Sequence, residues 1–479
     1  MGLRTAAEYL EGLRDNRTIY FRGERVPDLM EHPELRVGAE HTALDYRLAE
    51  DKVTQELFTE VFPETGERVS RYFIPPAGTE DLLKRREMIE MSTRAGSGVV
   101  LLIKEIGTDA LFSLYLVARQ VDQKYGTDYL GRVKKYHVEC RDRDLSMAVA
   151  QTDAKGDRGL LPSKQIHPDY YVHIVEKRAD GIVVRGAKAH TTGTAFVDEI
   201  IVLPTRALSE EDQDYAVAFA IPVNTPGVRL IASPFGFSGE SNYHHPVSSK
   251  HHLVETLTVF DDVFVPNERI FLAGEWDFAG LLANTFVEFH RFTAVSYKPP
   301  LLDLLIGATS LIAVYNGVEK ASHIRDKVTR LITYTETIRA LTRAAAMDCK
   351  VVDGIAVPDT LTTNIAKFHF ANNYHEAVRD VQDIAGALLV TGPSEEDWHN
   401  DDTRGDLEHY LGGRRGVSAM DRMKAINLIR DLTASDFGGY HELLAIHAEG
   451  SLEAQKITIF RGYDILRCMD IAKTAAGIE

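Results

Sequence analysis

The stretch Asp180-Gly181-Ile182-Val183-Val184-Arg185-Gly186 decides the fold. Its short apolar run follows an Asp-Gly pair, which is the pattern of a β-strand that leaves a hairpin turn. Similar apolar runs occur at 199–204, 215–220 and 253–260. Because no long helical segment separates these runs, the sequence predicts an antiparallel β-barrel or sandwich rather than a parallel sheet.

Helical patterns lie on both sides of this β region. Apolar side chains recur three and four positions apart in four stretches, 81–97, 108–125, 318–341 and 378–389. Thr5 and Glu8 form the sequence pattern of a helix capping box. The acidic segment 394–409 interrupts the last helical region, and we expect it to be a solvated loop.

The helix–β–helix order predicts an α+β multidomain chain. Its parts are an N-terminal helical domain over 1–145, a middle β-barrel or sandwich domain over 146–270 and a C-terminal helical bundle over 271–479. A dinucleotide-binding Rossmann enzyme alternates strands and helices throughout, and no GxGxxG pattern follows a strand here. A nucleotide cofactor would therefore bind by another geometry.

Net charge and cysteine content limit the binding partners and the cellular compartment that we expect. The chain has 479 residues with 54 Lys and Arg against 71 Asp and Glu, a formal net charge of −17. This sign repels nucleic acid and anionic lipid, so neither is an expected partner. The longest apolar stretch, 301–315, contains Asp303 and predicts a buried helix rather than a membrane span. Cys140, Cys349 and Cys468 are isolated, which suits a reducing, cytoplasmic location.

Two segments carry polar side chains suited to a nucleotide. The segment 152–159 combines Lys155 and Arg158 with two glycines, so it can hold an anion such as a pyrophosphate. The alternative is a surface loop tied by internal Asp–Arg pairs. The segment 185–193 ends a strand in hydroxyl, imidazole and glycine groups that can bond the edge of a heteroaromatic ring. Its alternative is a hydrated turn.

The remaining candidate functional residues are histidines. His290 lies among aromatic residues and is either a general acid or base or a buried core residue. Four imidazoles gather at 244–245 and 251–252, where they form either a substrate lid or a plain polar loop. No cysteine or Glu-x-x-His pattern accompanies them, so we expect no zinc or iron site there.

Several sequence blocks resemble the 4-hydroxyphenylacetate 3-hydroxylase family, which also contains 4-hydroxybutyryl-CoA dehydratase. The blocks are 122–127, 152–159, 174–190, 260–269 and 383–386, and the resemblance extends over nearly the whole chain. It implies an acyl-CoA dehydrogenase-like fold with helical, β and helical domains. It also implies FAD binding and a homotetramer, or a dimer.

The resemblance assigns roles to individual residues. It places FAD along Val149, Ala150, Gln151, Thr152, Lys155, Gly156, Asp157, Arg158, Gly450, Ser451, Leu452 and Glu453. Thr192 corresponds to a threonine beside the flavin N5 edge and, with His290, is a candidate catalytic residue. Arg206 is the third candidate, either pairing with a substrate carboxylate or lying on the surface. Residues 382–386 reach a neighbouring subunit's flavin in related folds.

The sequence departs from both branches of the family. The dehydratase branch holds an iron–sulfur cluster on three cysteines and a histidine, and the corresponding positions here are Leu101, Glu105, Tyr297 and His290. A cluster requires thiolates, so we expect no iron–sulfur cluster, no metal and no cluster-dependent dehydration. The hydroxylase branch surrounds its phenol with polar groups, and the positions matched to them are apolar: Ile106, Ala110 and Val149.

The resemblance implies a two-component monooxygenase that uses reduced FAD from a separate reductase. It would oxidise an aromatic or other electron-rich small molecule through a flavin C4a-hydroperoxide. The first alternative is a cluster-free, flavin-dependent dehydratase or isomerase of an acyl thioester, with His290 and Glu442 moving protons. The second alternative is a catalytically silent flavin-binding protein.

Overall fold

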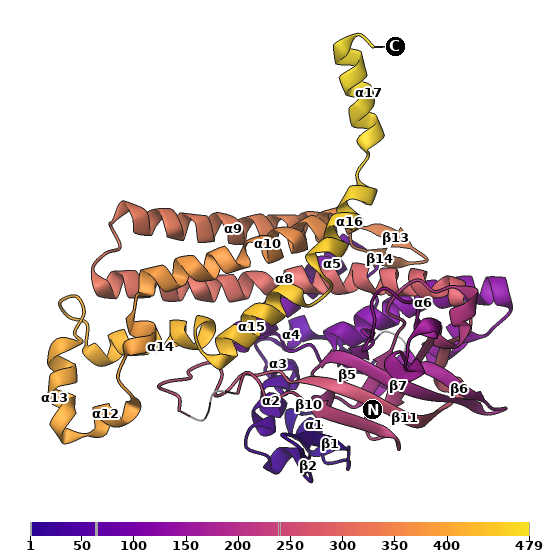
Figure 1. Ribbon diagram of the computed structural model, residues 1–479, viewed down its shortest axis with the longest axis horizontal. Coiled ribbons are helices and arrows are strands. Elements are labelled where there is room, and N and C mark those ends of the chain that lie inside the picture. The colour runs from indigo at the N-terminus through magenta and orange to yellow at the C-terminus, as the bar shows by residue number, and fades with distance from the viewer. Residues whose placement is uncertain (1, 63–65, 238, 240, 479) are drawn as a thin grey trace.

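The computed structural model describes residues 2–62, 66–237, 239 and 241–478. Met1 and Glu479, the outer bounds of the predicted domains, lie outside these described residues. Figure 1 shows N-terminal helices, a central region of strands and a C-terminal region of long helices. This order confirms the predicted α+β fold class.

The N-terminal part is mainly helical. Its helices are α1 Ala6–Gly12, α2 Leu35–Thr42, α3 Leu44–Glu50, α4 Gln55–Phe58, α5 Thr79–Ala95, α6 Glu105–Tyr125 and α7 Tyr129–Asp142. The predicted capping box at α1 is confirmed, because Thr5 accepts from the backbone of Glu8 and Glu8 bonds back to Thr5. A small hairpin of β3 Thr59–Val61 and β4 Arg68–Ser70 lies beside α4.

Two sheets form the middle of the molecule. One has the order β2 Glu24–Val26, β1 Ile19–Phe21, β10 Val228–Ala232, β11 Glu255–Pro266, β7 Gly181–Thr192 and β6 His173–Lys177. The other has the order β12 Ile270–Ala273, β9 Val217–Pro222, β8 Glu199–Val202 and β5 Met147–Ala150. Phe219 of β9 meets Phe260 of β11 edge-to-face at 5.8 Å between ring centroids, so the sheets share one core.

The pairing of strands agrees with the antiparallel prediction, with two exceptions. The Asp180-Gly181 hairpin joins β6 to β7, and Arg178 N donates to Gly181 O at 2.8 Å. Only β1–β10 and β5–β8 are parallel among the described pairs. The strand β1 comes from the N-terminal part, so the first domain contributes an edge to the middle sheet.

Long helices make up the C-terminal part. They are α8 Trp276–Asn316, α9 Ser322–Met347, α10 Thr360–Ala385, α11 Leu388–Thr391, α12 Glu395–His399, α13 Asp401–Tyr410, α14 Ala419–Thr433, α15 Asp436–His447, α16 Leu452–Gly462 and α17 Ile465–Ala476. A hairpin of β13 Lys350–Val352 and β14 Ile355–Val357 links α9 to α10. In Figure 1, α8, α9 and α10 lie side by side, and α17 projects away from the body.

The helix α8 is the longest and runs through the core. By length and composition it is the one helix of the described residues that could cross a membrane. It packs against α5, α6, α9 and α10, and half of its most apolar window is buried. That packing is typical of the core helix of a globular protein, and it confirms the buried helix predicted over 301–315.

The prediction of a solvated loop over 394–409 is wrong. The segment forms α12 and α13, because Ser394 and Asn400 cap the two helices through their side chains. Trp398 of α12 is buried and donates from its indole nitrogen to the Tyr243 hydroxyl at 2.6 Å. The acidic side chains that suggested a loop remain on the surface of these helices.

Glycines in left-handed backbone divide two of the predicted helical stretches. Gly317, with φ of 72°, ends α8, so α9 begins at Ser322 and not at 318. Gly386, with φ of 77°, ends α10, so the last residues of the 378–389 stripe lie in the separate helix α11. A side chain disfavours this backbone region, which explains why both helices end there.

A buried ion network fixes the start of α6. Lys104 Nζ lies 2.8 Å from Asp45 Oδ2 and 2.7 Å from Asp144 Oδ1, and all three side chains are buried. The ammonium also lies 3.9 Å from the ring centroid of Tyr46. Arg4 bonds to the second oxygen of Asp144 and to Asp198, so the N-terminus closes the network. The network sets the position of α6, whose first turns face α8.

Removal of the central cation should strongly destabilise the protein. In Lys104→Met, two buried carboxylates lose their shared partner, so the unfolding free energy should fall by about 3–5 kcal/mol. Denaturant unfolding followed by circular dichroism measures the change. Lys134→Met, at an exposed site on α7, is the matched control and should stay within about 0.5 kcal/mol. Equal stability of the two variants would contradict a structural role for the network.

Candidate functional site

Thr192, Glu255 and Tyr440 form a polar group where the middle sheet meets the helical bundle. Thr192 ends β7, Glu255 begins β11 and Tyr440 lies on α15. Thr192 Oγ1 donates to Glu255 Oε2 at 2.9 Å, and the Tyr440 hydroxyl donates to Oε1 at 3.4 Å. Burial raises the pKa of Glu255 to about 7, although both hydrogen bonds oppose the shift. Such a carboxyl can donate or accept a proton near neutral pH.

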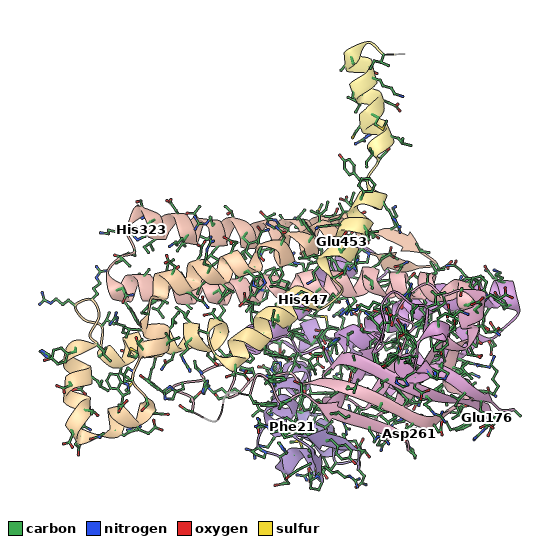
Figure 2. The ribbon with its side chains drawn as sticks, viewed as in Figure 1. Phe21, Glu176, Asp261, His323, His447 and Glu453 are labelled. Atoms are coloured by element: carbon green, nitrogen blue, oxygen red, sulfur yellow. The ribbon has the colours of Figure 1, made fainter. Side chains whose placement is uncertain are left out.

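A second carboxyl, Glu449, lies on the turn between α15 and α16. Figure 2 labels His447 and Glu453, which bracket this turn. The backbone φ of Glu449 is 61°, a left-handed conformation that costs a residue with a side chain about 1–2 kcal/mol. Its side chain is only 1% exposed. The strained turn therefore directs a carboxyl into the bundle, and such strain is concentrated at functional sites.

Side chains of α8 and α10 surround the Glu449 carboxyl. The Tyr297 hydroxyl donates to Oε1. Lys367 Nζ lies 3.0 Å from Oε2, and Lys298 Nζ lies 3.8 Å from the same oxygen. Arg291 Nε donates to the Glu449 backbone carbonyl at 3.1 Å. The carboxyl thus meets one phenol and two amines in the interior of the protein.

Burial moves the proton affinities of this cluster toward its uncharged forms. It raises the pKa of Glu449 well above its usual range, although Arg291 opposes the shift. It lowers the pKa of Lys367 to about 7, and Arg291 lowers it further. It also lowers the pKa of Lys298 well below its usual range, with a smaller effect from Lys367. Burial therefore favours the uncharged forms of all three groups.

The helix α15 connects the two carboxyl groups. It carries Tyr440, which bonds Glu255, and next to it the buried His441. Burial lowers the pKa of His441 to about 4, and Lys298 lowers it further. Nδ1 of His441 and both ring nitrogens of His252 have no hydrogen-bond partner among the described residues. Buried polar atoms are almost always paired, so these atoms indicate a place for a ligand or water.

His290 faces the N-terminal part from α8. Its ring stacks on Phe286 with 5.1 Å between centroids and an interplanar angle of 13°. Nδ1 lies 3.5 Å from Asp109 Oδ2 on α6. The imidazole is mostly buried, and it lies on the same helix as Tyr297 and Lys298. The structure thus brings His290 to the α8 side of the site, whereas Thr192 lies on the β7 side.

The segment predicted to lie along FAD is held firmly to the sheets. Val149 and Ala150 belong to β5, and Gln151 O accepts from Lys188 Nζ at 2.8 Å. Asp153 and Lys188 form a buried ion pair at 2.8 Å, and a backbone bond joins 152 to 189. These bonds replace the internal Asp–Arg pairs of the alternative prediction, because Arg158 has no acidic partner among the described residues.

Three cations lie along the rim of this segment. Lys155 is half-buried with φ of 73°, and Arg158 and Arg206 are exposed. Burial lowers the pKa of Lys155, and Arg158 and Arg206 lower it further, so the three side chains lie close to one another. Such a cluster attracts phosphate groups. Arg206 therefore lies with the predicted cofactor residues and not in the Thr192–Glu255 group.

The residues at 450–453 continue the Glu449 turn. Gly450 has φ of 98°, and a Cβ atom there would lie 2.9 Å from Arg291 Nη2, so this close approach requires glycine. Ser451 caps α16 by accepting from its third residue. Leu452 is half-buried, whereas Glu453 is exposed on the first turn of α16.

The histidine-rich loop 241–254 bridges the middle sheet and the bundle. His245 lies 3.5 Å from Asp431, and the backbone of Ser248 donates to the same carboxylate at 2.8 Å. His251 meets His41 of the N-terminal part at 3.2 Å. Among the described residues, no group of three His, Cys, Asp or Glu side chains is arranged to hold a metal ion.

The positions matched to cluster ligands do not suit an iron–sulfur cluster. Leu101 is fully buried and offers no ligand atom. Glu105 Oε1 accepts from the Tyr72 hydroxyl at 3.3 Å, and Tyr297 is bonded to Glu449. Each polar replacement is thus engaged with a partner of its own, and a cluster requires thiolates. The segment predicted to lie along FAD, in contrast, carries the cations Lys155 and Arg158, and Arg158 is exposed.

Comparison with known proteins places this geometry in a family. The sequence matches the model of the 4-hydroxyphenylacetate 3-hydroxylase N terminal over 5–272 and that of the C terminal over 279–477. The chain belongs to the 4-hydroxyphenylacetate 3-hydroxylase family. This confirms the resemblance drawn from the sequence blocks.

Relatives from both branches of the family are similar over nearly their full length. The 4-hydroxybutyryl-CoA dehydratase/vinylacetyl-CoA-Δ-isomerase of Clostridium aminobutyricum is 35% identical over 100% of both chains. The oxygenase component of 4-hydroxyphenylacetate 3-monooxygenase of Thermus thermophilus is 30% identical over 92% of this chain and 90% of its own. Sequence similarity alone therefore does not separate the two reaction types.

Solved structures of a dehydratase and of an oxygenase component are both similar to this chain. An oxygen-tolerant archaeal 4-hydroxybutyryl-CoA dehydratase from N. maritimus has a TM-score of 0.93, with 33% identity over 100% of this chain and 95% of its own. The oxygenase component of 4-hydroxyphenylacetate 3-monooxygenase in complex with FAD has a TM-score of 0.91, with 28% identity over 98% of both chains.

Sequence reasoning missed the buried carboxyl and amine groups of this site, whose pKa values burial shifts. Glu449 stands directly before the predicted 450–453 segment, and Lys367 lies in an ordinary helical stripe. Two features of the sequence could have indicated them: Glu255 is an acidic residue in an apolar strand, and Lys298 is a charged residue in an apolar helix. Glu442, in contrast, bonds the exposed His375 at 2.5 Å.

Glu105 should make the stability of the protein depend on pH. Burial raises its pKa from 4.5 to about 7, so the folded state keeps a proton that the unfolded state loses between these values. The stability of the native protein should fall as pH rises through this window. Glu105→Gln does not titrate and should be more stable above about pH 7.5, by at most about 3 kcal/mol.

Thermal unfolding of the native protein and Glu105→Gln from about pH 5 to pH 8 measures this difference. The gap in Tm should be small at the acid end and should grow with pH. Glu376→Gln, at an exposed site of α10, is the control and should show no growing gap. A constant gap for Glu105→Gln would show that Glu105 is ionised throughout this range.

Proposed function

We propose that this chain is a flavin-dependent isomerase that moves a double bond in a small acyl thioester. The observation that carries the proposal is Glu449, a buried carboxyl placed by a strained turn between a phenol and two amines. Burial raises the pKa of Glu449 well above its usual range, so its carboxyl can hold a proton near neutral pH. Groups of this kind transfer protons to and from carbon acids.

The proposed reaction exchanges two protons. One proton leaves the carbon beside the thioester carbonyl, and another arrives two carbons further along. The double bond moves into conjugation with the carbonyl, and no electrons are gained or lost overall. We assign proton removal to His290 and proton return to Glu449, whose carboxyl Tyr297 and Lys367 hold.

The flavin site supports the same proposal. Gln151, Thr152, Lys155, Arg158 and Thr192 are the residues that would hold FAD, with the rim cations beside its phosphates. When bound, FAD supplies redox chemistry that the side chains lack. Glu255 would lie behind Thr192 and fix its hydroxyl through the 2.9 Å hydrogen bond.

Isomerisation, rather than dehydration, fits the side chains present. The clostridial relative is named for both a dehydratase and a vinylacetyl-CoA-Δ-isomerase activity. Dehydration must expel a hydroxyl group as well as a proton, whereas isomerisation only moves protons. Because Leu101, Glu105 and Tyr297 occupy the positions matched to cluster ligands, we propose that this chain performs the proton transfers alone.

The flavin-loaded protein should therefore convert a vinylacetyl thioester to its conjugated isomer without oxygen. Glu449→Gln removes the proton donor and should lower kcat by about 10²–10⁴-fold. Absorbance of the conjugated thioester under anaerobic conditions measures the rate. Glu376→Gln, exposed on α10, should leave it unchanged. A strict oxygen requirement, or full activity of Glu449→Gln, would contradict the proposal.

A reduced-FAD-dependent monooxygenase is the second candidate. The fold match to an oxygenase component in complex with FAD favours it, as do the several relatives named as monooxygenases. A separate reductase would supply the reduced flavin, and His290 and Thr192 would face an aromatic substrate from the α8 and β7 sides, with Arg206 at the cofactor rim. Oxygen from ¹⁸O₂ would then appear in the product. A protein that binds flavin but supports neither reaction would be the catalytically silent alternative.

We also propose a homo-oligomer, as a tetramer or dimer, in a reducing cytoplasmic compartment. Figure 1 shows α17 projecting away from the body, and none of its residues is buried. Leu466 is 73% exposed and Met469 is 50% exposed. A helix of about 12 residues is marginal in water without a packing partner. A second copy of the chain would provide that partner.

Charges on this apolar face should weaken the assembly. Leu466→Glu combined with Met469→Glu should shift the mass in solution toward a smaller species, because buried carboxylates are unfavourable at an interface. Light scattering after size exclusion measures the mass. Lys473→Ala, exposed on the same helix, should leave it unchanged. An unchanged mass for the double variant would exclude α17 from the interface.

A further inference from the structure

Asp109 lies between a buried arginine and the imidazole of His290. Arg85 Nη2 donates to Asp109 Oδ1 at 2.7 Å, and His290 Nδ1 lies 3.5 Å from Asp109 Oδ2. The three side chains come from α5, α6 and α8, and all are buried. The carboxylate therefore has one oxygen fixed by the guanidinium and the other directed at the imidazole.

The second oxygen of Asp109 has no hydrogen-bond partner among the described residues, and neither has His290 Nδ1. The two unpartnered atoms lie 3.5 Å from each other. Stacking on Phe286 fixes the plane of the imidazole. A small closure of the 3.5 Å gap would give an ordinary hydrogen bond between the two atoms.

We propose that Asp109 is a positioning residue that keeps the Nδ1 proton of His290 in place. With that proton donated to Asp109, the other ring nitrogen, Nε2, is left as the proton acceptor. A neutral imidazole has one donor and one acceptor nitrogen, and the partner of one nitrogen selects the role of the other. The inference rests on the proposed function, in which His290 acts on the substrate.

The helix contact between α5 and α6 does not require the second oxygen of Asp109. Arg85 Nη2 also donates to Glu105 O at 2.8 Å and to Thr108 Oγ1 at 2.9 Å. The guanidinium can hold α6 through these bonds alone. The oxygen directed at His290 is therefore free for a role other than packing.

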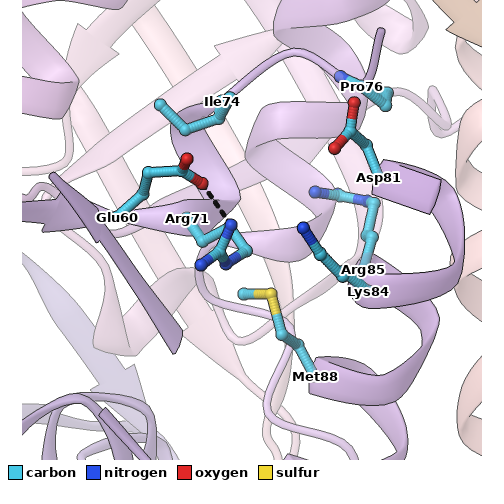
Figure 3. A pocket seen from close by; sticks show the side chains of 8 residues that line it. All are labelled: Glu60, Arg71, Ile74, Pro76, Asp81, Lys84, Arg85 and Met88. Carbon is cyan, nitrogen blue, oxygen red and sulfur yellow. Dashed lines mark hydrogen bonds and ion pairs between the residues drawn. The ribbon is translucent and has the colours of Figure 1, made fainter. Parts of the chain in front are cut away.

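Arg85 can also be reached from the surface. It lines a cleft together with Glu60, Arg71, Ile74, Pro76, Asp81, Lys84 and Met88. Figure 3 shows Lys84 and Arg85 extending from α5 into this cleft, with the Glu60–Arg71 ion pair on another wall. A small cation in solution can therefore enter the place that a shortened Arg85 side chain would leave.

Neutron diffraction of the flavin-loaded protein in D₂O tests the tautomer directly. At about pH 8, above the usual imidazole pKa, a deuteron should lie on Nδ1 of His290 and none on Nε2. A deuteron on Nε2 would overturn the inference. This measurement does not depend on which reaction the protein performs, so it separates the inference from the proposed function.

Kinetics test the consequence of the tautomer. Asp109→Asn should lower kcat by about 10- to 100-fold and leave KM nearly unchanged, as for other residues that orient a functional histidine. Arg85→Ala should show a similar loss, and added guanidinium ion should restore part of it through the cleft. Lys84→Ala lines the same cleft without touching Asp109 and should keep full activity with no response to guanidinium.

Two outcomes separate the possible failures. If His290→Ala is inactive while Asp109→Asn is fully active, the positioning role is wrong and the role of His290 stands. If His290→Ala is fully active, the assignment of His290 in the proposed function is wrong. Loss of FAD binding or of the native circular dichroism spectrum in Asp109→Asn would show that its role is structural, and would also overturn the inference.

Discussion

The structure depends on keeping the carboxyl of Glu449 buried against α8 and α10. Outside water a charged carboxylate is unfavourable, and a lone ammonium is equally so. Burial favours the uncharged forms of this carboxyl and of the nearby amines of Lys298 and Lys367, and the Tyr297 hydroxyl donates to the carboxyl. Lys367 also donates to the last carbonyls of α15, so the cluster holds the helix that leads to Glu449.

Buried ion pairs also hold helices in place further from the Glu449 carboxyl. The ion network of Lys104 fixes the start of α6, and the Arg85–Asp109 pair fixes the next turns of the same helix. As a result, α6 presents Asp109 to His290 on α8 at a defined place. The place of Asp109 beside His290 thus follows from buried charges that also hold α6 in the core.

The sequence predicts the architecture well because the spacing of apolar residues and the residues that form turns and helix caps are local properties of the chain. The Asp180-Gly181 hairpin and the Thr5–Glu8 capping box were predicted and are present. The prediction of a loop over 394–409 is wrong because it relied on the acidic composition of the segment. The helix cap at Ser394 is also a local sequence pattern, and it indicates a helix. The site was harder to predict, since Glu255, Lys367 and Glu449 acquire their chemistry only through burial among residues distant in sequence.

Residues assigned by resemblance remain separated into two groups in space. Lys155, Arg158 and Arg206 gather at the cofactor rim, whereas His290 lies on the α8 side with the buried amines. A flavin along the first group and a thioester beside the second would share the interior next to α15.

The most direct measurement is deuterium incorporation into a conjugated acyl thioester incubated with the flavin-loaded protein in D₂O without oxygen. If Glu449 and His290 move protons to and from carbon, deuterium enters at the carbon beside the carbonyl and at the carbon two positions further along, and Glu449→Gln abolishes it. A thioester that stays free of deuterium, together with ¹⁸O incorporation from ¹⁸O₂ into an aromatic product, would contradict the proton-transfer function.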